Sequence, residues 1–262
     1  NKKLDDDSSA NNISGIVGKE GLNRVMTHKQ TNKIRHSFKY SDDTMRDYGS
    51  IFSPDEIGKY SGKIKSICNI VMKSKGVVLI YSQYIDGGII PIALALEELG
   101  LTRASGGKSL FETPPTEPID AVSLKPKSVV EGVFNSAKYV MITGDKSISP
   151  DNVVDLKSVT SLDNVNGEKV KVVLISLAGA EGLDFKFIRQ VHVVEPWYNM
   201  NRIEQIIGRA VRTCSHKNLD FIDRNVEIYL HGTLNKDSDE EAADLYVYRV
   251  AEAKAVTMGR VS

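Results

Sequence analysis

Short, unbroken runs of apolar residues recur along the chain, and their length marks them as buried strands. The clearest run, Val-Val-Leu-Ile-Tyr at 77–81, is rich in β-branched residues and too short for a core helix. Comparable runs follow at 139–142, 170–175, 191–194 and 226–230. Strands that are apolar on both faces predict a mostly parallel sheet with helices on both sides.

Helical periodicity separates these strands. Apolar residues repeat at helical spacing over 64–71 between lysines, which predicts a surface helix that covers the sheet. The sequence Ser-Pro-Asp-Glu at 53–56 matches a capping box and predicts where ordered helical structure starts. Further helices are predicted at 89–99, 200–212 and 240–256. Strands alternating with helices indicate an α/β fold.

Three stretches differ from this alternation and suggest the domain organisation. Residues 1–50 are polar without a steady period, which predicts an N-terminal arm or linker, either ordered or the tail of a preceding domain. The main domain is predicted at 51–235, with a Gly- and Pro-rich insertion at about 102–136. Residues 236–262 are predicted to be a C-terminal helical extension.

Composition narrows the class of protein. Lys and Arg number 34, as do Asp and Glu, and this balance excludes a globally basic nucleic-acid coat while leaving a local basic groove open. The two cysteines, Cys68 and Cys214, exclude a disulfide scaffold and favour a reducing compartment. The longest mainly apolar run, 89–96, is far shorter than the roughly 20 residues that span a bilayer, so we expect no membrane segment. The chain opens Asn-Lys-Lys, without Met or a signal sequence, and we expect it to be part of a longer protein.

Candidate ligand residues follow the predicted strand at 170–175. In an open parallel sheet, ligands bind beyond the carboxyl ends of the strands. Gly182 would let the backbone approach an anion, and Asp184 offers a carboxylate that can accept a hydrogen bond from a sugar hydroxyl. A simple turn in which Asp184 caps the next element is the structural alternative.

The predicted helix at 200–212 carries basic side chains on one face. A helical wheel places Arg202, Gln205, Arg209 and Arg212 together, opposite an isoleucine-rich face. Aligned arginines repel one another unless an anion, carboxylates or solvent receives them. A solvated face is the simpler alternative. Binding of a phosphate group is the more specific interpretation of these arginines, because the guanidinium fork matches the geometry of phosphate oxygens.

These residues resemble three motifs of superfamily 2 helicases. Residues 205–212 match the Q-x-x-G-R-x-x-R pattern of motif VI, residues 176–184 resemble motif V, and residues 78–83 resemble motif IV. The resemblance covers roughly residues 54–256. Its closest likeness is to helicases of large nucleocytoplasmic DNA viruses of the pox-, asfar- and mimivirus type.

Two details refine this resemblance. The sequence Pro-Trp-Tyr-Asn at 196–199 is similar to the Swi2/Snf2 branch. Glu181 stands where DEAD-box proteins carry Arg in motif V, which disfavours a DEAD-box assignment.

The resemblance implies that the chain is the second of two RecA-like lobes, with ATP bound between them. The first lobe would supply the phosphate loop and the Mg²⁺-binding acidic motif, because this chain has no G-x-x-x-x-G-K-[S/T] sequence. Arg212 would act as a finger on the γ-phosphate, Arg209 would also meet the phosphates, and Gln205 would join them as a catalytic residue. Asp184 would meet the ribose, with Gly182 allowing close backbone approach.

The resemblance also implies a nucleic-acid track, DNA or RNA. Ser82, Gly144 and Ser176 would contact its backbone without reading sequence. The expected function is therefore the second motor lobe of an ATP-dependent helicase or translocase, inactive alone and located in the virion or host cytoplasm. Its expected partners are nucleic acid, its own N-terminal lobe and viral transcription machinery. The alternative is a non-catalytic RecA-like scaffold in a viral transcription or replication assembly.

Three further ring-bearing residues, His192, Trp197 and Tyr198, lie near the candidate site in the sequence. His192 lies between apolar residues in a predicted strand and is expected to be a satisfied interior histidine. Trp197 and Tyr198 either stack on a base or pack against the insertion.

Overall fold

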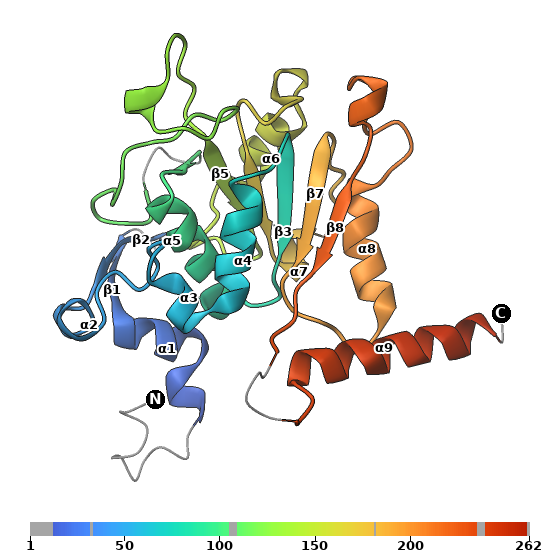
Figure 1. Cartoon of the computed structure of the whole chain (residues 1–262), viewed down its shortest axis with the longest axis horizontal. Coiled ribbons are helices and arrows are strands. Elements are labelled where there is room, and N and C mark those ends of the chain that lie inside the picture. Colours follow the sequence, from blue (N-terminus) through green and yellow to red (C-terminus); the bar gives the residue numbers. More distant parts are fainter. Residues whose placement is uncertain (1–12, 32–33, 105–108, 181, 235–238, 261–262) are drawn as a thin grey trace.

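The computed structural model describes residues 13–31, 34–104, 109–180, 182–234 and 239–260. Within these residues a parallel sheet has the strand order β4-β5-β6-β3-β7-β8 (Figure 1). Its strands are β3 (Val77–Tyr81), β4 (Thr102–Arg103), β5 (Lys138–Ile142), β6 (Val172–Ile175), β7 (Ile188–Val193) and β8 (Glu227–Leu230). This is the predicted RecA-like α/β fold, with the fully buried strand β3 between β6 and β7.

Helices cover both faces of the sheet, as predicted. Helices α4 (Gly62–Val71) and α5 (Ile90–Glu98) pack on one face, and α6 (Asn152–Thr160) and α8 (Met200–Ala210) pack on the other (Figure 1). The short α7 (Leu177–Ala180) follows β6. Alternate residues of β3, β5 and β6 enter one of two buried clusters, so these three strands are apolar on both sides.

The predicted helix start at 53–56 is wrong. The carbonyl of Ser53 accepts from the backbone N–H groups of Glu56 and Ile57 in a turn, and its side chain caps nothing in α3 (Ile57–Tyr60). Ser61 is extended and ends α3, and its hydroxyl accepts from the Ile64 N–H to cap α4. The two helices therefore share one break, and the cap stands eight positions later than the sequence suggested.

Two other helix boundaries differ from their predictions. Helix α8 ends at Ala210, so Arg212 lies beyond the helix that was predicted to include it. Helix α9 (Ala243–Gly259) begins and ends three residues after the predicted 240–256. It lies beyond the carboxyl ends of β7 and β8 and extends past the rest of the lobe (Figure 1).

The region before residue 50 contains structure that its polar sequence did not predict. Its elements are η1 (Ile13–Ile16), α1 (Gly18–Val25), the antiparallel pair β1 (Met26–Thr31) and β2 (Ile34–Tyr40), and α2 (Asp42–Asp47). Leu22, Met26, Phe38 and Tyr40 join the same buried cluster as α4 and α5. The domain boundaries at residues 50 and 235 stay predictions.

The segment predicted as an insertion is mostly irregular, but it begins with the edge strand β4 and contains η4 (Lys127–Val129). Two buried carboxylates hold it in place. Asp120 accepts from the backbone N–H groups of Val122, Ser123 and Asn135. Glu97 of α5 accepts from the backbone N–H groups of Leu110 and Phe111.

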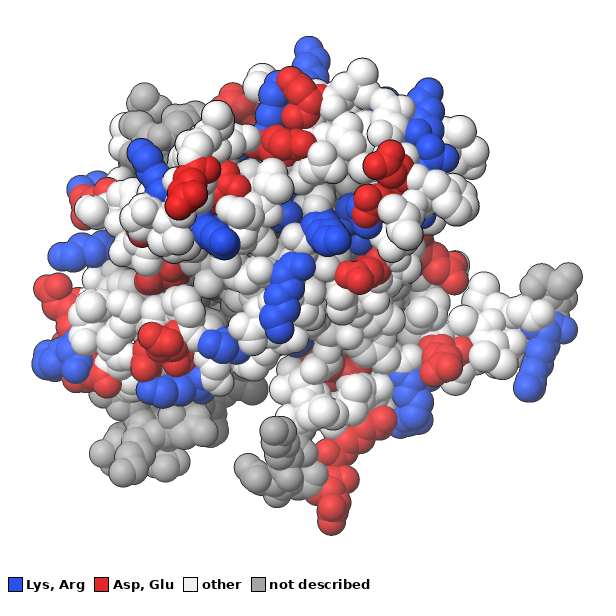
Figure 2. All heavy atoms as spheres, turned by 45° about the horizontal axis from the view of Figure 1, so that its top comes forward, with Lys and Arg blue, Asp and Glu red and all other residues white. Residues whose placement is uncertain are grey.

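The face of the molecule drawn in Figure 2 carries no extended area of one charge among its coloured residues. Lys and Arg side chains are interspersed with Asp and Glu on the face shown. This matches the zero net charge of the whole chain. Among the described helices, none combines the length and apolar character needed to cross a membrane.

Candidate functional site

Two distant segments of the chain meet at Arg209 and Arg212. Arg212 Nη1 lies 2.6 Å from Asp184 Oδ1, and Arg209 Nη1 donates to the Leu183 carbonyl at 3.3 Å. The Phe185 N–H donates to the Arg209 carbonyl at 3.2 Å, which fixes the backbones together. The structure therefore brings together the predicted ribose carboxylate and both predicted phosphate-binding arginines.

Local geometry leaves these groups open to a ligand. Gly182 has φ +72°, and a Cβ there would meet nothing within 4 Å. Gly208 is also open at its Cβ position, although it lies inside α8. The side chains of Asp184 and Arg212 are 60% and 42% exposed. A phosphate or sugar can thus approach both without displacing core side chains.

The predicted basic face of α8 divides into two parts. The Arg202 guanidinium lies 3.8 Å from the centre of the Trp197 ring, as a cation–π contact. Arg209 and Arg212 instead bind the 183–184 segment, and the Arg212 Nε also donates to the Gly208 carbonyl at 3.1 Å. Gln205 is exposed. The structure thus places Arg202 on Trp197, apart from Arg209 and Arg212, and phosphate binding by this face stays a prediction.

The three predicted nucleic-acid residues follow adjacent strands at one edge of the sheet. The Ser82 N–H donates to the Ile175 carbonyl at 3.1 Å, and the Ser176 N–H donates to the Ile142 carbonyl at 3.3 Å. Gly144 is exposed, whereas Ser82 and Ser176 are buried. The structure brings these loops together, with both serine hydroxyls turned into the protein.

Close packing between α7 and the end of β5 explains two glycines in these loops. A Cβ at Gly179 would lie 1.9 Å from the Ile142 carbonyl oxygen, so only glycine fits there. A Cβ at Gly144 would lie 2.7 Å from the Ala178 Cβ. The backbone of the loop after β5 is therefore fixed against the start of the motif V segment.

Sequence reasoning missed Glu195, which joins two of the candidate loops. Its Oε1 accepts from the Ser82 hydroxyl at 2.8 Å, and its Oε2 accepts from the Gln83 N–H at 3.2 Å. Burial raises the pKa of Glu195, and these two hydrogen bonds oppose that shift. An acidic residue directly between a buried strand and Pro196 was the one available signal.

The prediction for His192 is confirmed. His192 is fully buried, and its Nδ1 lies 2.9 Å from the Nε2 of His231, the residue after the neighbouring strand β8. The Tyr229 ring stacks on it at 4.8 Å between centroids. Burial lowers the pKa of His192 to about 3 and that of His231 to about 4. Both rings are neutral interior groups at physiological pH.

Three further points concern Trp197, Glu181 and possible metal ligands. Trp197 packs on Arg202 and Tyr198 in the described structure. Glu181 lies outside the described residues. Among the residues that are described, no cluster of three or more His, Cys, Asp or Glu side chains is arranged to hold a metal ion.

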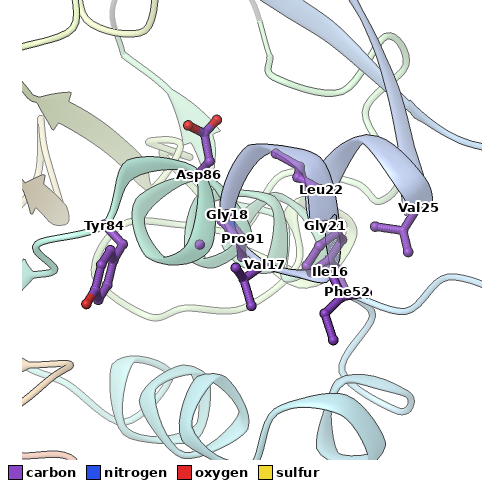
Figure 3. A pocket seen from close by; sticks show the side chains of 11 residues that line it. Ile16, Val17, Gly18, Gly21, Leu22, Val25, Phe52, Tyr84, Asp86 and Pro91 are labelled. Carbon is purple, nitrogen blue, oxygen red and sulfur yellow. The ribbon is translucent and has the colours of Figure 1, made fainter. Parts of the chain in front are cut away.

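Two cavities flank the loop that follows β3. One, of about 630 Å³, lies between α1 and this loop, with Tyr84 at the opposite end from Val25 (Figure 3). The other, of about 610 Å³, is lined by residues 60–64, by Glu195 and by the segment after β8. Tyr84 and Gly87 line both cavities.

Comparison of the chain with known proteins also points to helicases, as the motifs at residues 78–83, 176–184 and 205–212 do. Residues 93–214 match the helicase conserved C-terminal domain. The termination factor NPH-I homolog of African swine fever virus (isolate Tick/Malawi/Lil 20-1/1983) is 33% identical over 181 residues, covering 65% of this chain and 26% of that protein. A protein of Acanthamoeba polyphaga mimivirus, named as an ATP-dependent RNA helicase, is 28% identical over 201 residues, covering 74% of this chain and 30% of that protein.

A solved structure, the C-terminal part of the Fun30 ATPase domain, aligns with a TM-score of 0.46 and 15% identity, covering 76% of this chain and 50% of that one. The aligned part of the chain spans 26% and 30% of the length of the two viral relatives. Residues 93–214 of the chain therefore match a helicase conserved C-terminal domain, and the chain is similar to proteins of large DNA viruses that are named as helicases or as a termination factor.

Proposed function

We propose that this chain is the second motor lobe of an ATP-dependent nucleic-acid helicase or translocase. The meeting of Arg209 and Arg212 with the Gly182–Asp184 segment carries the proposal. A preceding lobe would hold ATP with Mg²⁺, and closure of the two lobes would bring both guanidinium groups onto the phosphates. Charge that develops on the transferred phosphoryl group is what such arginines stabilise.

Each residue of the site has a separate role in this proposal. Arg212 is the finger on the γ-phosphate, Arg209 contacts the phosphates from the last turn of α8, and exposed Gln205 faces the same cleft one turn earlier. Asp184 accepts from a ribose hydroxyl, and Gly182 leaves room for the nucleotide beside it. ATP supplies the energy for closure, while Mg²⁺ ligands belong to the first lobe.

The nucleic-acid backbone would lie along the loops after β3, β5 and β6. Ser82, Gly144 and Ser176 begin or belong to these loops, and their strands are adjacent in the sheet. With both serine hydroxyls inside the protein, backbone N–H groups and exposed loop residues would make the phosphate contacts. One relative is named a termination factor and another an RNA helicase, so we infer viral transcription machinery as a partner, in the virion or host cytoplasm.

ATP hydrolysis by the full-length protein tests this function. The rate is measured without nucleic acid and with single-stranded DNA, duplex DNA or RNA, beside the isolated 262-residue chain. We expect at least one nucleic acid to stimulate the full-length protein and the isolated chain to hydrolyse no ATP. Absent hydrolysis, or a rate that no nucleic acid changes, would instead support the non-catalytic scaffold.

A further inference from the structure

Glu195 links two segments that leave the sheet side by side. Tyr81 and Val193 are paired in the register of β3 and β7, and the Val194 N–H donates to the Tyr81 carbonyl at 3.0 Å. Glu195 is the next residue, and its carboxylate turns back to bind both Ser82 and Gln83. Glu195 is more than 110 positions away from Ser82 and Gln83 in the chain.

The Ser82 hydroxyl is saturated by this arrangement. It accepts from the Tyr84 N–H at 3.2 Å, and its proton is directed to Glu195 Oε1 at 2.8 Å, with the Tyr84 carbonyl at 3.1 Å as the other acceptor. A charged acceptor forms the stronger hydrogen bond, so the carboxylate is the preferred partner. Ser82 has no accessible surface. It therefore shapes the loop from within the protein.

The loop beyond Ser82 is held closely on this pair. A Cβ at Gly88 would stand 2.0 Å from the Ser82 Oγ and 3.3 Å from Glu195 Oε1, so η2 (Ile85–Ile89) packs directly on the hydrogen bond. Tyr84 and Gly87 remain exposed and separate the two cavities described above. The position of this exposed surface depends on the Glu195 carboxylate.

On its other side, Glu195 leads straight into the arginine helix. Pro196 is buried and fixes the backbone, and Trp197 receives the Arg202 guanidinium on its ring. Arg202 lies in the first turn of α8, whose last turn carries Arg209. A chain of packed contacts thus runs from the loop after β3 to the groups beside Asp184.

We propose that Glu195 is a positioning residue that couples the strand-contacting loop after β3 to the arginine helix. Nucleic acid held on the loop restrains the start of α8 through Glu195, and this restraint sets the position of Arg209 and Arg212 at the other end. The inference rests on the proposed motor function and adds the element that transmits track binding to the nucleotide site.

The test compares full-length wild type with Glu195→Gln. Glutamine has nearly the same volume as glutamate and keeps one oxygen that can accept from the Ser82 hydroxyl. It carries no charge, however, and its NH₂ group would face the Gln83 N–H, where two donors cannot form a hydrogen bond. The link between Glu195 and the loop should therefore weaken. We expect nucleic-acid stimulation of ATP hydrolysis to fall about tenfold, with the unstimulated rate unchanged. Glu227→Gln is the matched control, because Glu227 accepts only from side chains of Gln190 and Tyr229 in the described contacts.

The outcomes separate the link from general stability and from the motor function itself. Equal losses of the stimulated and unstimulated rates, or no loss at all, would overturn the coupling role while leaving the motor intact. A wild type that no nucleic acid stimulates would overturn both proposals.

A second readout uses the single tryptophan of this chain, Trp197. In the 262-residue chain, we expect a single-stranded oligonucleotide to change the Trp197 emission of the wild type and of Glu227→Gln. The change should be lost in Glu195→Gln at an oligonucleotide concentration that still saturates binding. The same emission change in both glutamate variants would count against the link.

Discussion

Arg212 and Asp184 form an ion pair, with 2.6 Å between Nη1 and Oδ1. In the proposed mechanism Arg212 contacts the γ-phosphate of ATP and Asp184 contacts its ribose. Nucleotide binding would therefore break this ion pair and form one new contact for each residue. Both side chains are largely exposed, and exposed pairs contribute at most about 1 kcal/mol. The ion pair therefore keeps two candidate nucleotide-binding side chains close together, and breaking it costs little free energy.

The first prediction separates the roles of these two residues. In the full-length protein, Arg212→Ala should lower kcat about a thousandfold, because the finger acts on the transition state. Asp184→Asn should raise the KM for ATP about tenfold and leave kcat largely intact, because a ribose contact contributes to binding. Steady-state kinetics measure both constants. Arg46→Ala, on the distant α2, is the control with unchanged kinetics.

Stability measurements complete that prediction. The isolated chain should melt within about 2 °C of wild type with either substitution, because the pair is exposed. A large drop in melting temperature for Arg212→Ala would show that the arginine is structural, and the kinetic loss would then need another explanation.

The second prediction concerns the attachment of the N-terminal hairpin. The Tyr40 hydroxyl donates to Glu98 Oε1 at 2.6 Å and accepts from the Phe52 N–H at 3.3 Å, and Glu98 is only 6% exposed. Tyr40→Phe leaves this buried carboxyl without its donor and should lower the free energy of unfolding by about 1–3 kcal/mol. Denaturant unfolding measures the change. In a Glu98→Gln background the same substitution should cost clearly less, and equal costs in both backgrounds would show that the two residues are not coupled.

The sheet could be predicted because its strands carry their signal locally. The 77–81 run is apolar at every position, and all of it is buried. The arginine motif was also visible, since Gln205, Arg209 and Arg212 have fixed spacing in the sequence. The end of α8 was not, because the apolar pattern continues to Val211 while the backbone leaves the helix there, with φ −99° and ψ 87°.

The remaining errors arise from contacts between distant segments. The β1–β2 hairpin has polar strands, and it is stabilised by burying Phe38 and Tyr40 against α5 and the insertion. The contact of Glu195 with Ser82 likewise depends on β3 and β7 lying side by side. Strand order is a property of the folded sheet, so neither contact leaves a periodic pattern in the sequence.

The third prediction follows from the neutral histidine pair. Because burial lowers the folded-state pKa of His231 to about 4, the unfolded chain binds more protons between pH 6.5 and 4. The contribution of this histidine to the free energy of unfolding is fully present above pH 6.5. About 3 kcal/mol of it should be lost as the pH falls from 6.5 to 4. Urea unfolding at a series of pH values should therefore show a shallower pH dependence for His231→Gln. Tyr229→Phe keeps the stacked ring and should retain the wild-type slope, and a wild-type slope in His231→Gln would contradict the prediction.

The fourth prediction uses the one position where stability and activity should move in opposite directions. Gly208 lies inside α8, where glycine costs about 0.5–1 kcal/mol relative to alanine, and a Cβ there meets nothing within 4 Å. Gly208→Ala should therefore raise the melting temperature of the chain. In the full-length protein the same change should lower ATP hydrolysis, because the open space beside Gly208 adjoins Arg209 and Arg212, where the phosphates must approach. Gly62→Ala, at the equally open start of α4, is the matched control that should not reduce hydrolysis. If Gly208→Ala stabilises the chain and leaves hydrolysis unchanged, the nucleotide does not approach this face of α8, and the assignment of the arginine pair to ATP would have to be abandoned.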